Sequence, residues 1–189
     1  MSRGVRSSEA ADGPPGPAAT GRTEGGSESM SVVTADEMAR EPFLSGMRRA
    51  DLTGLARAAR RTGFPAGRRI VNESDPAERF WLVQDGTVAL DLHPPGRGPV
   101  VVGTFGPGSA LGWSWLFRPH RWRFGAFAQT PVRAIEFDGR LVRTLCAVDP
   151  SLGYELTRRF AELVVERLEA TQTRLLEVSL DTLDDAPVP

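Results

Sequence analysis

The sequence predicts a mainly β domain, a barrel or sandwich of short strands, with helices before and after it and a long helix near the C-terminus. Two patterns predict this class. Between residues 62 and 138, short apolar or alternating runs are separated by Gly, Pro and Asp, which is typical of many short strands. After Asp138 the apolar residues return to helical spacing. The length of 189 residues suits one domain with a single core.

The elements before the strands begin near Thr34. The segment "TADEMAREPFLSGM" has Thr34 as a helix N-cap and Glu37 three residues later, as in a capping box. The next segment, "RADLTGLARAAR", predicts a second short helix with Leu52 and Leu55 facing inward. Residues 1–30 are rich in Gly, Pro, Ser, Ala and Glu, so we expect a disordered tail there.

The strand region is predicted from four runs, "GFPAGRRIVNES", "AERFWLVQDGTVALDLH", "GPVVVGTFGPGS" and "FGAFAQTPVRAIEFD". Within the second run, Asp85–Gly86 is a dipeptide typical of tight two-residue turns. We therefore predict a hairpin at this turn.

Two helices are predicted after the strands. "GRLVRTLCAV" forms the first, and Asp149 caps the second with Pro150 at its first position. The second helix is predicted to reach about Val178, a length of about 40 Å. One apolar stripe, Leu152, Leu156, Phe160 and Leu163, is predicted to pack on the strands.

A second stripe on the long helix has heptad spacing. Its members are Val164, Leu168, Thr171, Leu175 and Val178. We interpret this stripe as the seam of a homodimer; the alternative is that it lies along its own domain. The ordered domain then spans residues 31–180, and residues 181–189 form an acidic tail.

Composition excludes several function classes. The 23 basic residues are all arginine and are balanced by 24 acidic residues, so a nucleic-acid binder that works by bulk charge is not expected. The chain has a single cysteine, Cys146, so it cannot form an internal disulfide. The sequence neighbours of Cys146 are apolar, which favours its role as a small buried hydrophobic residue. Two scattered histidines, His93 and His120, supply no catalytic or metal-binding constellation, so we predict no enzyme and no metal site. Without a membrane span or signal peptide, a cytoplasmic protein is expected.

The order of elements and four glycine-marked segments carry a resemblance. "FPAGRRIVNESD" with Gly67, "FWLVQDGTVALDL" with Gly86, "FGPGSALGW" with Gly108 and Gly112, and "RAIEFDGRLVRTL" are similar to the motifs of one family. The chain resembles the cyclic-nucleotide-binding domain of catabolite-activator-like and oxygen-responsive bacterial regulators from about Pro42 to Val178. This resemblance implies a cyclic-nucleotide-binding-type β-roll, a double-stranded β-helix or cupin-like jelly roll, followed by a long C-terminal helix. One glycine that the family usually has in the entry turn is Ser74 here.

By this resemblance, the segment "SALGWSWLFRPHRWRFGAFA" contains the phosphate-binding cassette. The implied anion or nucleotide pocket comprises Gly112, Trp113, Ser114, Trp115, Arg121, Trp122 and Arg123. In the family a glutamate binds the ribose and an arginine binds the phosphate; the corresponding positions in this chain are Trp113 and Trp122. Arg121 or Arg123, which flank Trp122, could take the role of the arginine. Losing one partner of a buried charge pair costs about 2–5 kcal/mol, more than the ~0.3–1 kcal/mol that a helix N-terminus typically supplies. We therefore expect weak binding of cyclic AMP, and similar binding of cyclic GMP.

The tryptophans have two interpretations, stacking on a flat ligand or filling the mouth of the barrel. The first makes the protein a non-enzymatic sensor with a degenerate pocket for a cyclic nucleotide or another small anion, signalling through a partner protein. The second makes it a ligand-free interaction module with a Trp-filled pocket. A truncated transcriptional regulator is a further alternative. Only "LDTLDDAPVP" follows Ser179 where the family's regulators carry a helix-turn-helix, so no direct DNA binding is expected.

Overall fold

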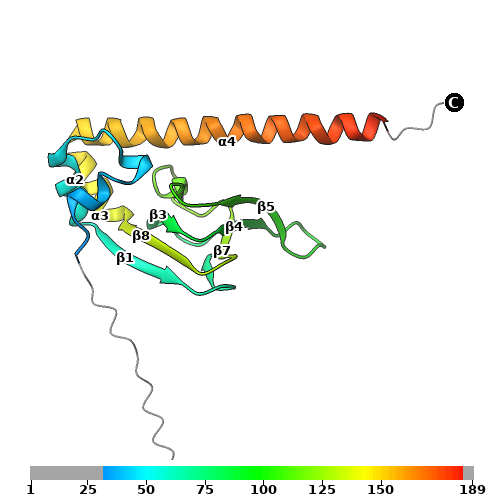
Figure 1. Ribbon diagram of the computed structural model, residues 1–189, viewed down its shortest axis with the longest axis horizontal. Coiled ribbons are helices and arrows are strands. Elements are labelled where there is room, and N and C mark those ends of the chain that lie inside the picture. The colour runs from blue at the N-terminus through cyan, green and yellow to red at the C-terminus, as the bar shows by residue number, and fades with distance from the viewer. Residues whose placement is uncertain (1–31, 185–189) are drawn as a thin grey trace, which may run out of the picture.

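The computed structural model describes residues 32–184, with side chains described as far as Glu177. Helices come first, eight strands follow, and two helices end the described chain (Figure 1). The elements are α1 (Ala35–Met38), a 3-10 turn η1 (Pro42–Leu44), α2 (Arg49–Ala56), β1 (Ala59–Phe64), β2 (Arg69–Val71), β3 (Arg79–Asp85), β4 (Val88–Leu92), β5 (Val100–Phe105), β6 (Ala110–Leu111), a 3-10 turn η2 (Trp113–Trp115), β7 (Gly125–Ala128), β8 (Val132–Asp138), α3 (Gly139–Val148) and α4 (Pro150–Asp184).

The strands form two four-stranded antiparallel sheets, in the orders β1-β8-β3-β6 and β2-β7-β4-β5. The chain crosses repeatedly between the sheets, and strands that are far apart in sequence pair. For example, β1 pairs with β8 from Ala59↔Phe137 to Phe64↔Val132. This topology is the β-roll that the sequence predicts. The strand pattern begins at Ala59, three residues before the Thr62 predicted from the sequence.

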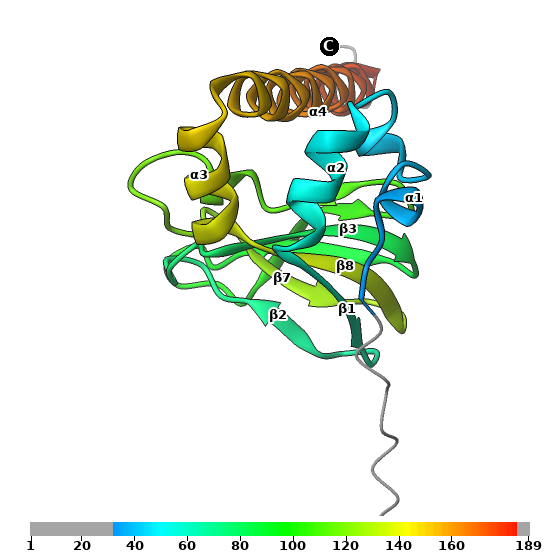
Figure 2. The same cartoon turned by 90° about the vertical axis from the view of Figure 1, so that its left-hand side faces the viewer.

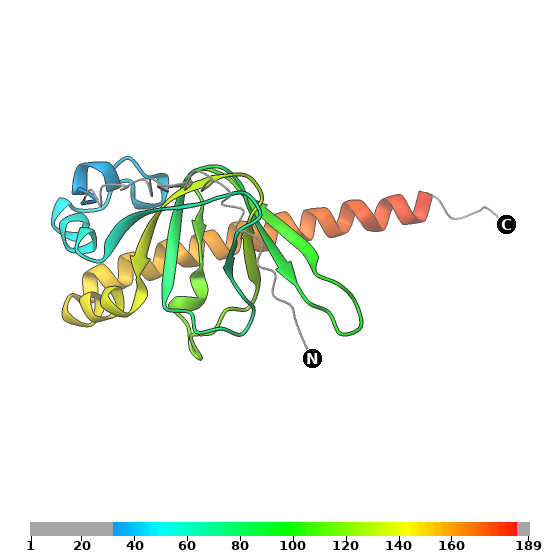
Figure 3. The same ribbon diagram turned by 90° about the horizontal axis from the view of Figure 1, so that it is seen from below.

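The predicted hairpin at Asp85–Gly86 is wrong. Gly86 does adopt a turn conformation, with φ of +84°. However, β3 pairs with β6 and β8, whereas β4 pairs with β5 and β7, so the turn passes the chain from one sheet to the other. A Cβ on Gly86 would lie 2.1 Å from the Pro131 carbonyl oxygen, so the crossing also requires glycine for space. The hairpin in this region joins β4 to β5, and it projects from the roll (Figure 3).

The helices cover one face of the sheet β1-β8-β3-β6, with α4 as the outermost layer (Figure 2). The Thr34 hydroxyl accepts a hydrogen bond from the Glu37 amide at 3.2 Å, as the predicted N-cap requires. Leu52 and Leu55 of α2 are buried, as predicted. The core beneath the helices joins apolar residues of the sheet to those of the helices, Met38, Leu44, Leu52, Leu55, Phe80, Leu82, Ile135, Phe137, Val142, Leu152, Leu156 and Phe160.

The long helix α4 begins as the sequence predicts. The Asp149 carboxylate accepts hydrogen bonds from the Ser151 and Leu152 amides, which caps the helix. Leu152, Leu156 and Phe160 are buried, so the stripe predicted to pack on the strands does so. The helix continues to Asp184, six residues beyond the predicted end, and the predicted tail at 181–189 therefore begins inside it. Residues 1–30, predicted to be disordered, lie outside the described residues.

The heptad stripe does not lie along its own domain. Val164 is half-buried, Thr171 is exposed, and Leu168 and Leu175 are 55% and 66% exposed. The side chain of Val178 lies beyond the described side chains. From Leu168 to Glu177 every described side chain of α4 is exposed, and the helix extends past the roll (Figure 1).

Candidate functional site

The segment that resembles a phosphate-binding cassette lies between β6 and β7. It opens at Gly112, whose φ of +107° is a conformation that residues with a side chain rarely adopt. Trp113, Ser114 and Trp115 then form a single 3-10 turn, η2. The short helix predicted here is therefore only one turn long, and it follows a backbone bend that requires glycine.

Trp115 belongs to the hydrophobic core. It is fully buried, and its ring stacks on Phe80 with centroids 4.8 Å apart. The ring also meets Phe160 of α4 edge-on, at 5.7 Å. Trp115 thus joins the cassette to the sheet and to the long helix, and its ring is not accessible to a ligand.

Trp122 fills the space above the cassette glycine. It is 7% exposed and stacks on Trp81 with centroids 5.8 Å apart. A Cβ built on Gly112 would lie 2.8 Å from the Trp122 Cη2 atom, so the indole touches the backbone of the bend. By the resemblance given above, this is the position where a phosphate-binding arginine is expected. The indole therefore occupies that position with an apolar ring.

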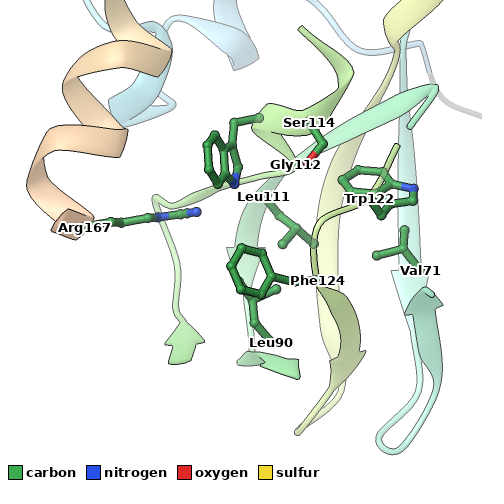
Figure 4. Close-up of a pocket in the computed structure, with 9 residues that line it drawn as sticks. Val71, Leu90, Leu111, Gly112, Ser114, Trp122, Phe124 and Arg167 are labelled. Carbon is green, nitrogen blue, oxygen red and sulfur yellow. The ribbon is translucent and has the colours of Figure 1, made fainter. Parts of the chain in front are cut away.

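The cavity that remains between these side chains is very small, about 10 Å³. Its lining residues, drawn in Figure 4, are Val71, Leu90, Leu111, Gly112, Trp113, Ser114, Trp122, Phe124 and Arg167. Small-molecule sites typically measure about 300–1,000 Å³, and a cavity of about 10–15 Å³ is the least that holds one water. The described conformation therefore leaves no room for a nucleotide in the cavity between Gly112 and Trp122.

Arg167 of α4 is the charged residue that lines this cavity. Figure 4 shows its side chain reaching from the helix toward Leu111 of β6 and toward Phe124, which precedes β7. Its guanidinium lies over the Phe105 ring, 3.8 Å from the centroid, and donates a hydrogen bond to the Ala110 carbonyl at 2.8 Å. Burial lowers the pKa of Arg167 to about 10, so the group is a cation at neutral pH.

The two arginines predicted as counter-charges do not line the cavity. The guanidinium of Arg121 donates to the Ser74 carbonyl at 2.8 Å, which ties the cassette loop to the turn after β2. Arg123 is exposed. The structure thus brings Gly112, Trp113, Ser114 and Trp122 together at the cavity and places Trp115, Arg121 and Arg123 elsewhere.

Sequence reasoning missed Arg167. The residue lies four positions after Leu163 and seven after Phe160, so it falls on the stripe that packs on the roll. An arginine on an otherwise apolar stripe was the available signal, because charged residues are seldom placed on a buried face without a partner.

Cys146 is half-buried, and burial raises the pKa of its thiol, as for an unreactive cysteine. Among the described residues, no group of three or more His, Cys, Asp or Glu side chains is placed to hold a metal ion. None of the described helices is both long and apolar enough to cross a membrane.

Comparisons with known proteins identify relatives of the domain. A family model of the cyclic nucleotide-binding domain matches residues 61–149. The chain is 23% identical over 141 residues to a CRP-like cAMP-activated global transcriptional regulator of Mycobacterium tuberculosis. The alignment covers 75% of this chain and 61% of the relative, less than two thirds of its length.

Solved structures share the fold. A Geobacter metallireducens protein described as cyclic nucleotide-binding is 25% identical with a TM-score of 0.66, and the match covers 72% of this chain and 98% of that one. The catabolite activator protein of Thermus thermophilus is 20% identical with a TM-score of 0.58, over 73% of this chain and 63% of that one. The regulatory domain of Toxoplasma gondii PKA, solved with cAMP, is 19% identical with a TM-score of 0.57, over 68% and 48% of the two chains.

Proposed function

The chain carries a cyclic nucleotide-binding domain and is related to CRP-like regulators, and on this premise we propose that it is a non-enzymatic regulatory module with a self-filled nucleotide pocket. In this proposal the cassette binds no cyclic nucleotide in the described conformation. In this proposal the protein's own side chains fill the space that a ligand would occupy, and the long helix α4 contacts a partner.

One observation carries the proposal. The indole of Trp122 lies against Gly112 and reduces the cavity to about 10 Å³. To open a nucleotide-sized site, Trp122 would have to leave its stack on Trp81 and become exposed. Moving a buried aromatic side chain into water costs about 1.5–3 kcal/mol for its apolar surface alone, so any ligand would bind with that much less affinity.

The chemistry of the lining supports the same conclusion. The family resemblance places a ribose-binding carboxylate at residue 113 and a phosphate-binding guanidinium at residue 122, and both are tryptophan in this chain. A phosphate brought into this lining would lack the bidentate partner that arginine provides. Arg167 is a cation at the edge of the cavity, but its guanidinium is already engaged by Phe105 and the Ala110 carbonyl.

The exposed stripe on α4 supports a role in association. Leu168 and Leu175 are exposed large apolar residues on a helix that extends past the roll. Heptad-spaced apolar residues are the pattern by which helices pack side by side in coiled coils. We propose that the partner on this stripe is a second copy of the chain, which gives a homodimer, and that a further partner protein responds to the position of the helix.

Isothermal titration calorimetry with cAMP and with cGMP tests the filled pocket. We expect no measurable binding of either nucleotide by the wild-type protein at millimolar ligand. The informative variant is Trp113→Glu combined with Trp122→Arg, which reintroduces the carboxylate and guanidinium and removes both indoles from the cavity. Its circular dichroism spectrum establishes that it is folded, and we expect it to gain cAMP affinity. Micromolar or tighter binding of cAMP by the wild type would refute the proposal.

A further inference from the structure

One residue connects the long helix to both the roll and the start of the cassette. Arg167 lies on α4, its guanidinium stacks on Phe105 at the end of β5, and it donates a hydrogen bond to the Ala110 carbonyl in β6. Gly112 follows Ala110 by two residues and opens the cassette bend. The side chain therefore contacts the segment that enters the cassette and the ring that faces α4.

Arg167 is also the final anchor of α4 along the described chain. Before it, Phe160 is fully buried and Leu163 packs on the same core. After it, each described side chain from Leu168 to Glu177 is exposed. Arg167 therefore lies where α4 leaves the roll, and the exposed part of the proposed dimer stripe begins at the next residue, Leu168.

The charge of Arg167 is not balanced locally by an ion pair. In the described part of the chain, no carboxylate lies within ion-pair distance of its guanidinium, although Glu166 is its sequence neighbour. Arg167 is half-buried, and partly removing a cation from water without a counter-charge has a cost that an apolar side chain packed on Phe105 would not have. The guanidinium fixes the orientation of this contact, because it donates a hydrogen bond to the Ala110 carbonyl while its plane covers the Phe105 ring.

We propose that Arg167 is a clamp that couples the cassette to the long helix, so that a change in one shifts the other. The clamp deepens the proposed function, because it supplies the regulation of that same self-filled pocket. A displacement of Ala110 or Phe105 removes the hydrogen bond or the stacked ring, and α4 beyond residue 167 is released. Thermodynamic coupling is reciprocal, so a partner that pulls the helix away also loosens the entrance of the cassette.

Hydrogen–deuterium exchange of Arg167→Met tests the clamp. Methionine keeps an unbranched apolar stem but removes the cation and its donor. We expect about tenfold faster exchange in two separate segments, residues 160–177 of α4 and residues 110–117 of β6 and the cassette, with little change in β1 and β8. The matched control is Arg174→Met, which lies two turns further on the same side of α4, is exposed, and should leave both segments unchanged.

A double-mutant cycle separates coupling from simple packing. Phe105→Leu removes the ring under the guanidinium and should also speed exchange in α4, although residue 105 lies on a strand. Arg167→Met removes the ring contact together with the hydrogen bond to Ala110, so adding Phe105→Leu should change the exchange little beyond that of Arg167→Met alone. Additive effects, or faster exchange in α4 with an unchanged cassette, would overturn the clamp.

The outcome is independent of the nucleotide titration. If the wild type binds cAMP while the exchange pattern is as expected, the self-filled pocket is wrong and the clamp stands. If no nucleotide binds and only α4 responds to Arg167→Met, the pocket proposal stands and the clamp is wrong.

Discussion

At the scale of single residues, the three cassette tryptophans show how position decides role. Trp115 is part of the core beneath α4, Trp122 fills the roll above Gly112, and Trp113 is half-buried at the edge of the cavity. All three are large aromatic residues close together in sequence. Trp115 packs in the core beneath the helices, whereas Trp122 packs in a second apolar cluster, formed by residues of both sheets that include Trp81 and Leu90. A substitution at Gly112, which Trp122 touches, is the most direct test of how Trp122 packs.

Gly112→Ala should destabilise the protein more than Gly46→Ala. Both glycines have positive φ, +107° and +76°, so alanine is strained at either position by about 1–2 kcal/mol. A Cβ at residue 46 meets no atom within 4 Å, whereas at residue 112 it meets the Trp122 ring at 2.8 Å. Overpacking of this kind costs about 1–3 kcal/mol more. Urea unfolding measures the difference.

A second variant identifies the source of this additional cost. Replacing Trp122 by leucine in the Gly112→Ala background removes the atoms that clash, so the excess over Gly46→Ala should shrink. An equal loss of stability in Gly112→Ala and Gly46→Ala would show that Trp122 does not press on the bend.

At the scale of elements, the start of α4 depends on one carboxylate. Asp149 accepts hydrogen bonds from the Ser151 hydroxyl and from the Ser151 and Leu152 amides, and Arg48 approaches its other oxygen at 3.3 Å. The Ser151 hydroxyl first, and then the backbone amides, lower the pKa of Asp149 below its ordinary value of 3.8. The cap therefore fixes where α4 begins and makes its first turn sensitive to acid.

Asp149→Ala should lower the melting temperature by a few degrees at pH 7, because the first-turn amides lose their acceptor. A carboxylate whose folded pKa is lowered stabilises the protein above its unfolded pKa, and this contribution is lost as pH falls through the folded value. The difference in melting temperature between wild type and Asp149→Ala should therefore narrow below pH 3.8.

Asp149→Asn is the control for the cap, since its side-chain oxygen still accepts the amide hydrogen bonds but does not titrate. It should remain close to the wild type at pH 7. Differential scanning calorimetry between pH 7 and pH 3 compares the three proteins. A gap between wild type and Asp149→Ala that is constant with pH would contradict the assignment.

At the scale of the whole molecule, the exposed part of α4 carries large apolar side chains that have no packing role in a monomer. Ten consecutive residues from Leu168 to Glu177 have exposed side chains, and Leu168, Leu175 and Leu176 are large and apolar among them. Large apolar groups that recur along an exposed helix usually mark an interaction surface. Leu168 and Leu175 are seven residues apart, as successive heptad positions are.

Leu168→Asp combined with Leu175→Asp should convert a dimer into a monomer, because two charges would be buried in the seam. Analytical ultracentrifugation at micromolar concentration measures the mass. Leu176→Asp is the matched control: it removes an equally exposed leucine but lies off the heptad stripe, so the dimer should persist. A wild-type protein that is monomeric under these conditions would contradict the proposed seam.

The sequence by itself determined the features that depend on neighbouring residues. The caps at Thr34 and Asp149, the extent of α3 and the buried stripe of α4 all follow from side chains within a few positions of each other, and each is as predicted. Gly108 and Gly112 marked the approach to the cassette because a positive φ is a local property of the backbone. The order of these local signals predicted a barrel or sandwich of short strands between helices, and the resemblance to the family specified the β-roll.

Tertiary structure alone decided which distant residues meet. Asp85–Gly86 has the local chemistry of a hairpin, but hydrogen bonds to β8 and β7 take the two flanking strands into different sheets. Whether Trp122 would stack on a ligand or fill the roll depended on Trp81 and Gly112, which lie elsewhere in the chain. Arg167 gained its role from Phe105 and Ala110 in the same way. Cavity filling and sheet pairing depend on contacts that the chain makes only after folding, so no local pattern encodes them.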